Sequence, residues 1–317
     1  MKCVVTGAAG FVGSHLCELL LAQGDEVVGI DCFTDYYDPS AKQRNLGSVL
    51  GHERFTLRRE DLLGAALPAL LDGIDVVYHL AGQPGVRPSW GAEFGSYVSR
   101  NVLATQALLE AAKGAQLRKF VYASSSSVYG DAEAYPTAET VRPQPVSPYG
   151  VTKLAAEHLC ELYRVGFGVP TASLRLFTVY GPRQRPDMAF SRLVTAGLSG
   201  GVFELYGEGT QTRDFTYVAD VVGAFRDAAG SAFTGVANIG GGARTSMNEV
   251  LEIVAELAGP LDVRRLPVMR GDVRDTAADT TTARDGFGYR PRVDLRQGLA
   301  AMVAARRQST VLAGASA

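Results

Sequence analysis

The chain has 317 residues, of which 46% are hydrophobic, and its formal net charge at pH 7 is −2. This size and composition allow a large core in one domain or in two closely joined ones. The near-neutral charge argues against nucleic acid or a membrane surface as a partner, and no stretch approaches the roughly 18 consecutive apolar residues of a membrane span. The amino-terminal MKCVVTGAAG lacks the features of a signal peptide, so we expect a cytoplasmic protein.

The cysteines and histidines form no metal-binding pattern. Cys3, Cys17, Cys32 and Cys160 are scattered, without a CxxC pair or a Cys/His spacing. We therefore expect small buried thiols in a reducing compartment, and no bound metal. His79 lies inside the apolar run DVVYHLAG, where it is expected to pack at the end of a strand.

Short β-branched runs alternate with helical patterns up to about residue 176. This alternation predicts an α/β fold of the Rossmann type, a doubly wound parallel sheet covered by helices on both faces. Beyond residue 176 the loops lengthen and glycines cluster. We expect a first domain over residues 1–176, to which about 215–240 returns, a smaller mixed α/β lobe over 177–305, and a flexible tail over 306–317.

The stretch VTGAAGFVG joins the first predicted strand to the first predicted helix. Gly7, Gly10 and Gly13 allow a tight turn and let a pyrophosphate approach the helix N-terminus. Asp31 ends the second strand, 18 residues beyond Gly13, where a carboxylate accepts both hydroxyls of a ribose. A carboxylate there repels a 2′-phosphate, which favours NAD over NADP.

Two more stretches are expected at the same edge of the sheet, because ligands bind at the carboxyl ends of such strands. Asp61 and Leu62 follow the third strand, and HLAG (residues 79–82) ends the fourth. The cofactor contacts that we predict are Gly7, Ala9, Gly10, Phe11, Val12, Gly13, Asp31, Asp61, Leu62, Leu80, Ala81, Gly82, Ser124, Tyr149 and Lys153.

The stretch SPYGVTK places Tyr149 and Lys153 four residues apart on one face of a helix. An ammonium beside a phenol is expected to lower the pKa of the phenol from about 10 toward neutrality, which makes the tyrosine a usable proton acceptor. The run SSSSVYG follows the fifth strand and offers the hydroxyls of Ser125 and Ser126 to the same centre.

Together these motifs resemble the extended short-chain dehydrogenase/reductase family, and specifically its nucleotide-sugar epimerases. The resemblance rests on TGAAGFVGSHL, HLAG, SSSSVYG, YGVTK, RDFTYVADVV and RGDVRDTAAD, and it covers about residues 1–300. It implies bound NAD, Tyr149 as the base, Lys153 as the residue that tunes it, and Ser125 with Ser126 at the catalytic Ser/Thr position. It also implies contacts with a UDP-sugar, for which we expect Arg87, Ser125, Ser126, Tyr149, Thr178, Arg185, Arg192, Arg213, Asp272 and Arg274.

The serine run also separates reactions within this family. Related sugar dehydratases carry an Asp-Glu pair where this chain has Ser126 and Ser127, and related UDP-glucuronate decarboxylases carry Glu at the position of Ser127. Without a carboxylic acid there, elimination and decarboxylation lose their expected acid/base, whereas epimerisation at C4 does not need one.

The stretches FTVYGPRQRPDMA and DYYDPSAKQRNL resemble the branch of UDP-glucuronate 4-epimerases, which interconvert UDP-glucuronate and UDP-galacturonate. We expect Arg185, with Thr178 nearby, to bind the carboxylate of the sugar, since the planar fork of arginine matches a carboxylate. Arg192 is the rival for this role.

Several alternatives stay open at this point. One is a UDP-glucose/UDP-galactose 4-epimerase with the same catalytic residues, and others are a UDP-glucuronate decarboxylase, a net dehydrogenase or a non-catalytic NAD-binding protein. The resemblance also implies a homodimer, and apolar stripes in NVLATQALLEAAKGA and YGVTKLAAEHLCELYRVG would serve as its interface.

Overall fold

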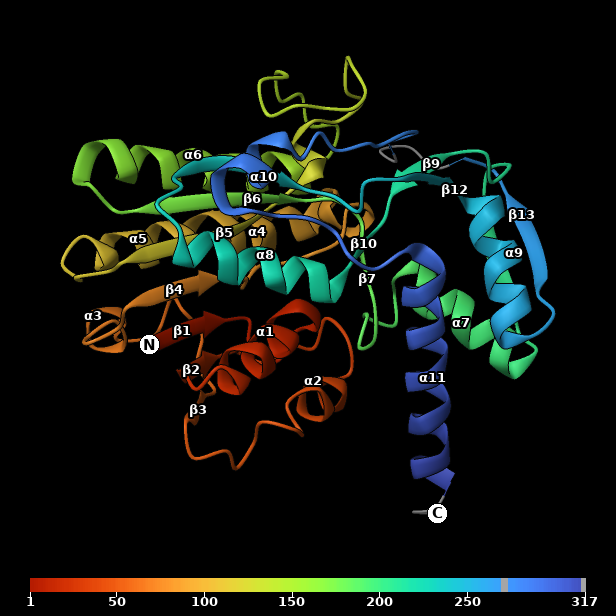
Figure 1. The fold of residues 1–317 in the computed structure, drawn as a ribbon, viewed down its shortest axis with the longest axis horizontal. Coiled ribbons are helices and arrows are strands. Elements are labelled where there is room, and N and C mark those ends of the chain that lie inside the picture. The colour runs from red at the N-terminus through yellow and green to blue at the C-terminus, as the bar shows by residue number, and fades with distance from the viewer. Residues whose placement is uncertain (269–272, 315–317) are drawn as a thin grey trace.

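The computed structural model of the protein describes residues 1–268 and 273–314, with side chains as far as residue 309. Its centre is a seven-stranded sheet in the order β11-β6-β5-β4-β1-β2-β3, in which all neighbouring strands run parallel. This confirms the predicted Rossmann-type sheet (Figure 1). The strands are β1 (Lys2–Thr6), β2 (Glu26–Ile30), β3 (Phe55–Arg58), β4 (Val76–His79), β5 (Lys119–Ser125), β6 (Thr171–Leu176) and β11 (Gly235–Ile239).

Helices cover both faces of this sheet (Figure 1). One face carries α1 (Phe11–Ala22), α8 (Val218–Gly230) and α10 (Thr281–Phe287), and the other carries α3 (Leu67–Leu70), α5 (Ala104–Ala112) and α6 (Pro148–Phe167). Each face has its own apolar core, with Leu20 and Phe225 in the first and Leu108 and Cys160 in the second. The near-continuous apolar strands of the sequence follow from this burial on two sides.

The second half of the chain builds a further apolar core outside the large sheet, which includes Leu193, Val250 and Leu299. The helices around it are α7 (Ala189–Ser199), α9 (Met247–Ala258) and α11 (Leu295–Gly314). The accompanying strand pairs are β8 (Val202–Tyr206) with β13 (Asp262–Leu266), β9 (Thr212–Asp214) with β12 (Arg244–Ser246), and β7 (Val179–Tyr180) with β10 (Thr216–Tyr217).

The predicted limits of the two domains stay a proposal, which the topology supports. β11 and α8, which fall within the predicted return segment of about residues 215–240, pack on the large sheet. The segment predicted as a tail from residue 306 lies within α11 as far as residue 314.

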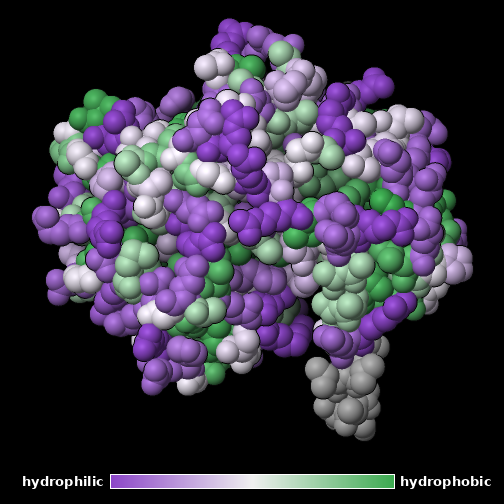
Figure 2. Space-filling model, in the orientation of Figure 1, coloured by the Kyte–Doolittle hydropathy of each residue, from purple (hydrophilic) through white to green (hydrophobic). Residues whose placement is uncertain are grey.

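The remaining short elements lie in the connections around the carboxyl ends of the strands. They are α2 (Pro39–Asn45), α4 (Phe94–Tyr97), the 3-10 turns Arg87–Ser89, Gly91–Glu93 and Ser126–Val128, and a π-helical turn at Val98–Leu103. On the face shown in Figure 2 hydrophilic residues predominate, with a hydrophobic area over the second lobe. Among the described helices, none is both long and apolar enough to span a bilayer.

Candidate functional site

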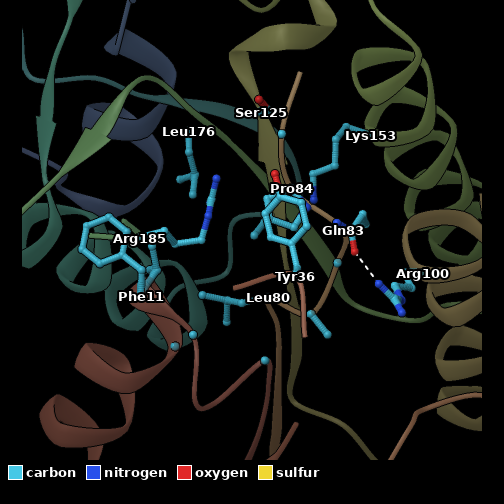
Figure 3. Close-up of a pocket in the computed structure, with 18 of the residues that line it drawn as sticks. Phe11, Tyr36, Leu80, Gln83, Pro84, Arg100, Ser125, Lys153, Leu176 and Arg185 are labelled. Carbon is cyan, nitrogen blue, oxygen red and sulfur yellow. Dashed lines mark hydrogen bonds between the residues drawn. The ribbon is translucent and has the colours of Figure 1, made fainter. Parts of the chain in front are cut away.

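A cavity of about 480 Å³ opens at the carboxyl ends of the parallel strands. It lies where the order of the strands reverses, between β1 and β4, which is the usual ligand crevice of such sheets. All the predicted cofactor residues except Ala9 line it, and so do the predicted substrate residues Ser125, Ser126, Tyr149, Thr178 and Arg185. Figure 3 shows Ser125, Lys153 and Arg185 around this cavity, with Tyr36 and Pro84 between them.

The glycine-rich turn between β1 and α1 is packed too tightly for side chains. A Cβ on Gly13 would stand 2.1 Å from the carbonyl oxygen of Gly7, and Gly7 itself has φ +69. Gly10 caps α1, and no acidic residue follows in the first helical turn, so the helix presents its N-terminus to an anion. The tight glycine cradle and the open helix end fit the pyrophosphate of a dinucleotide.

Asp31 is buried at the end of β2, and its carboxylate already accepts hydrogen bonds from other groups of the protein. It accepts hydrogen bonds from the backbone of Ala9 (3.2 Å) and Phe33 (2.8 Å), and Nζ of Lys42 lies 3.3 Å from the same carboxylate. Ala9 therefore orients Asp31 instead of lining the cavity. Because Lys42 offsets the charge of Asp31, the predicted preference for a ribose diol depends on hydrogen-bond acceptance more than on repulsion of a 2′-phosphate.

The first turn of α6 packs directly against the serine turn that follows β5. Ser147 caps the helix by accepting a hydrogen bond from the backbone of Gly150 (3.1 Å), and Pro148 occupies the first helical position. A Cβ on Gly150 would stand 2.5 Å from the carbonyl oxygen of Ser127, so glycine is needed for this contact. The packing brings Tyr149 close to the hydroxyl of Ser125, near enough for hydrogen bonding between them to act on the phenol.

The structure corrects our expectation for the acidity of Tyr149. Burial raises the pKa of Tyr149, and the hydrogen bond from Ser125 and the charge of Arg185 counteract this only in part. The ring of Tyr97 packs edge-on against it, with 6.3 Å between centroids, and adds to the burial. Desolvation therefore outweighs the neighbouring positive charges.

Lys153 lies one helical turn beyond Tyr149, and its ammonium is 4.7 Å from the centroid of the Tyr122 ring. Burial lowers the pKa of Lys153 to about 8, although the charge of Glu157 acts in the opposite direction. The side chain therefore lies close to its titration point at neutral pH.

Behind the serine turn, a buried ion pair fixes the end of β5. Arg175 of β6 donates to both carboxylate oxygens of Glu157 on α6, at 3.0 and 2.5 Å. Glu157 also accepts the hydroxyl proton of Ser124 at 2.7 Å. This network holds two strands and α6 together directly beneath Ser125.

Arg185 lies in the wall of the cavity and uses one edge of its guanidinium within the protein. Nε and Nη2 donate to the carboxylate of Asp187 at 3.0 and 2.9 Å. No bond from Nη1 occurs among the described hydrogen bonds, so the edge formed by Nη1 and the second Nη2 proton is left for another carboxylate. Tyr36 lies beside it, with its ring centroid 5.8 Å from the guanidinium.

The other arginines predicted to bind substrate lie outside the lining of this cavity. Arg192 is 3.6 Å from the carboxylate of Glu204, and Arg87 stacks on the ring of Tyr206. Arg213 donates to the backbone carbonyls of residues 273 and 274, and the side chain of Arg274 is exposed. Asp272 lies outside the described residues. The substrate roles of these residues stay predictions.

Several residues of the site are not identified by the sequence analysis. Lys42 and Tyr36 come from the connection after β2, and both lie in the wall of the cavity. Asn101 is buried in the π-helical turn, where its side chain bonds the backbone of Gln83 (2.6 and 3.1 Å) and the hydroxyl of Thr152 (3.0 Å). Neither the burial of Asn101 nor its π-helical turn can be read from the sequence, so the sequence offered no signal for it, although such turns are frequent at functional sites.

His79 is fully buried, as predicted for a packing residue. Its ring nitrogens lie 2.7 Å from the hydroxyl of Thr6 and 2.9 Å from that of Thr105. Burial lowers the pKa of His79 to about 3, so the ring is neutral. Within the described ranges, no group of three or more His, Cys, Asp or Glu side chains is placed to hold a metal ion.

The parallel sheet, the glycine cradle and the buried carboxylate of Asp31 at the cavity define a dinucleotide-binding protein of the Rossmann type. Residues 3–240 match the NAD dependent epimerase/dehydratase family. A Bacillus subtilis relative, an uncharacterized UDP-glucose epimerase, is 44% identical over 303 residues, which are 94% of this chain and 96% of that protein. The chain belongs to the NAD dependent epimerase/dehydratase family.

The chain is also similar to solved structures. UDP-glucuronic acid 4-epimerase from Bacillus cereus, in complex with UDP-glucuronic acid and NAD, matches with a TM-score of 0.94 and 44% identity, over 98% of this chain and all of that one. A Y149F mutant of the same enzyme, in complex with UDP-4-deoxy-4-fluoro-glucuronic acid and NAD, matches equally well. UDP-glucose 4-epimerase from Mycolicibacterium smegmatis is 38% identical, over 96% of this chain and 97% of that protein.

The glycine cradle leads to a prediction about cofactor affinity. In Gly13→Ala the new methyl group collides with the carbonyl of Gly7, so the turn has to shift and the affinity for NAD falls by about tenfold or more. Gly223→Ala is the control, because Gly223 lies within α8 and a Cβ there meets no atom within 4 Å. Calorimetric titration of both variants with NAD measures the effect, and equal affinity in the two would contradict the cradle.

The lowered pKa of Lys153 leads to a prediction about stability. Between about pH 8 and the ordinary lysine pKa of about 10.4, the unfolded chain keeps a proton that the folded chain has lost. The free energy of unfolding therefore gains from Lys153 as pH rises through this window, and the cost of burying the ammonium is complete below it. We expect the stability advantage of Lys153→Met over the wild type to shrink between pH 7 and 10.

Urea unfolding of the NAD-free protein measures this difference. Lys2→Met is the control, because the side chain of Lys2 is exposed. A stability difference for Lys153→Met that does not change with pH would show that the ammonium is not destabilised by burial.

Proposed function

We propose that the protein is a UDP-glucuronate 4-epimerase, which uses bound NAD to interconvert UDP-glucuronate and UDP-galacturonate. The observation that carries this proposal is the position of Arg185. Its guanidinium offers a free edge in the same cavity as Tyr149 and Ser125, close enough for its charge to act on the phenol. The similarity to the Bacillus cereus enzyme supports the same substrate.

NAD, when bound, supplies the acceptor and donor of the hydride for transient oxidation at C4 of the sugar. Gly7, Gly10 and Gly13 would hold its pyrophosphate, Asp31 its adenosine ribose, and Lys153 the nicotinamide end. The residues of this chain move the accompanying proton. Tyr149 would act in its phenolate form, in which it takes the proton of the C4 hydroxyl and later returns it, and Ser125 would orient both oxygens by hydrogen bonding.

The distribution of acidic residues supports epimerisation over elimination or decarboxylation. The acids that line the cavity are Asp31, Glu60 and Asp61, and all of them follow β2 or β3, at the adenosine end. Beside Tyr149 the wall consists of Ser125, Ser126 and Ser127. Among the residues that the structure describes, the catalytic end therefore has hydroxyls and no carboxylic acid to act as a second acid or base.

The carboxylate of the sugar has to be held firmly in this reaction. Oxidation at C4 makes a β-keto acid, which loses carbon dioxide when the bond to the carboxylate lies perpendicular to the plane of the ketone. Two charge-assisted bonds from the free edge of Arg185, with Thr178 nearby, would keep the carboxylate out of that orientation. Arg192 pairs with Glu204 outside the cavity lining, which favours Arg185 for this role.

The test of the proposed function is to incubate the protein with UDP-glucuronate and to analyse the product by NMR. We expect the C4-inverted sugar, without release of carbon dioxide and without net formation of NADH. The competing function is a UDP-glucose/UDP-galactose 4-epimerase, which the Bacillus subtilis and Mycolicibacterium smegmatis relatives favour. A higher kcat/KM for UDP-glucose on the same preparation would replace the proposal with that function.

The role of Arg185 has its own prediction. Arg185→Ala removes two charge-assisted bonds to the carboxylate, so kcat/KM for UDP-glucuronate falls by about 100-fold or more, while that for UDP-glucose changes little. Arg192→Ala is the matched control and leaves the ratio of the two values unchanged. Equal losses on both substrates in Arg185→Ala would assign Arg185 to something other than the carboxylate.

We also propose that the protein is a homodimer. Val151, Leu162 and Val165 form an apolar stripe along the outer side of α6, and Leu103 lies just before α5. Leu162 is 60% exposed and Val165 70% exposed, on a helix whose other side is in the core. The spacing of 11 and 14 residues from Val151 keeps all three side chains on one helical face, as expected for a helix that packs on a partner.

A charge in the apolar stripe of α6 is predicted to lower the molecular mass of the protein in solution from that of a dimer to that of a monomer. Val165→Asp places a charge in the stripe, so the protein becomes monomeric at micromolar concentration, as light scattering will measure. Val268→Asp alters an exposed valine of the other lobe and leaves the mass unchanged. A monomeric wild type would contradict the proposal.

A reducing cytoplasm is the compartment that we propose. All four cysteines are free, with Cys3, Cys17 and Cys160 buried and Cys32 exposed at the cavity. Unpaired thiols in all four positions are typical of proteins in a reducing compartment.

A further inference from the structure

The loop between β7 and α7 sends its two arginines in different directions. Arg185 lines the cavity. Arg183, two residues earlier, lies outside the cavity lining, and its guanidinium contacts α1. The loop itself spans residues 181–188 and includes Gly181, whose φ is +148 and whose Cβ would stand 2.5 Å from the side chain of Val218. The two guanidinium groups of this loop therefore have separate tasks.

Arg183 is bonded to the helix that begins at the glycine cradle. Its Nη2 donates to Glu18 at 2.5 Å and its Nη1 to the hydroxyl of Ser14 at 3.3 Å. One turn along, Nε2 of His15 donates to the carbonyl oxygen of Pro182 at 2.9 Å. Glu18 accepts a further hydrogen bond from Ser48, so it is held from a second segment as well.

The backbone of the loop shows that this contact constrains it. Arg183 has φ +65, in the left-handed region that residues other than glycine rarely adopt. Such conformations persist where the surrounding contacts fix them. Here the fixing contacts are those to Glu18, Ser14 and the His15 ring.

Further hydrogen bonds hold the loop between Arg183 and Arg185. The side chain of Gln184 is buried and bonds the carbonyl oxygen of Val179 (3.1 Å) and the backbone nitrogen of Ser191 (2.9 Å). Just beyond, the carbonyl oxygen of Arg185 accepts a hydrogen bond from the backbone of Met188 at 3.1 Å. A displacement of Arg183 is therefore transmitted to Arg185.

We propose that the contact of Arg183 with Glu18 is a latch, which fixes the loop to α1 and positions Arg185 for the sugar carboxylate. This inference rests on the proposed function. Arg183 and Glu18 are positioning residues for specificity, because they act through Arg185 and do not line the cavity. The latch also joins the helix of the cofactor cradle to the loop of the sugar site, so the two sites share one rigid support.

The latch has a chemical consequence for the fate of the ketone. In a loosened loop, the carboxylate can rotate toward the perpendicular orientation. The C5–C6 bond then breaks, its electron pair becomes the enolate of the C4 ketone, carbon dioxide leaves, and C5 takes up a proton. The share of turnovers that end in carbon dioxide and a UDP-4-ketopentose therefore reports on the position of Arg185.

Two variants open the latch from opposite sides. Glu18→Gln removes the charge on α1, and Arg183→Gly removes the guanidinium while glycine keeps φ +65 without strain. The control is Glu256→Gln, which breaks the ion pair of Arg296 with Glu256 in the second lobe. All variants are assayed as holoenzymes on UDP-glucuronate and on UDP-glucose. The carbon dioxide released from UDP-glucuronate and the hydrogen exchange of the peptide 181–188 are measured as well.

We expect each latch variant to lower the ratio of kcat/KM for UDP-glucuronate over UDP-glucose by about tenfold, and to raise the share of carbon dioxide. The double variant should lose no more than either single one, because both remove the same contact. Exchange of the peptide 181–188 should become faster in the latch variants and stay unchanged in Glu256→Gln.

Three outcomes would overturn the latch or its role. Unchanged exchange in both variants shows that the contact does not hold the loop. Faster exchange with an unchanged substrate ratio shows that the loop is held but that Arg185 is positioned otherwise. A wild type without turnover of UDP-glucuronate removes the proposed function and the role in specificity, and the exchange data then still decide whether the contact holds the loop.

Discussion

The whole site depends on the close contact between the first turn of α6 and the serine turn after β5. Because Gly150 has no side chain, the carbonyl of Ser127 approaches the helix, and Tyr149 reaches Ser125. One turn later the same helix supplies Lys153, and one turn after that Glu157, which binds Ser124 and Arg175. Tyr149 and Ser125 are thus held by α6 and β5, which the hydrogen bond of Ser124 joins to the buried pair of Glu157 with Arg175 on β6. Regular elements keep such a geometry fixed better than loops would.

The fold and the cofactor side of the site could be predicted because their signals are local. The glycines of residues 7–13, Asp31 and HLAG each follow a strand, and in a parallel sheet all strands end at the same edge. Tyr149 and Lys153 were predictable as a pair because four residues make one helical turn. Ala9 is the exception among the predicted cofactor residues, since its amide bonds Asp31.

The rest depends on contacts between distant segments, which spacing alone does not encode. Lys42 reaches Asp31 from α2, and Asn101 joins Gln83, in the loop after β4, to Thr152 of α6 through a π-helical turn. The direction of the pKa shift of Tyr149 is set by how completely other elements, Tyr97 among them, bury the phenol. Arg183 and Arg185 point in different directions because Arg183 adopts a left-handed backbone conformation. The sequence does not predict this conformation, since it depends on the packing of the loop on α1.

The side-on pairing of Arg185 with Asp187 has a consequence for how the enzyme tells sugars apart. A lone buried guanidinium would penalise every substrate without a negative group, because it would be left without a counter-ion. Here Asp187 remains its counter-ion whatever sugar enters. Under the proposed role of Arg185, discrimination therefore arises from extra attraction for the acidic sugar and not from rejection of the neutral one. Such a pocket accepts both acidic and neutral sugars. A change of the preferred hexose among related proteins therefore requires no new counter-ion for Arg185.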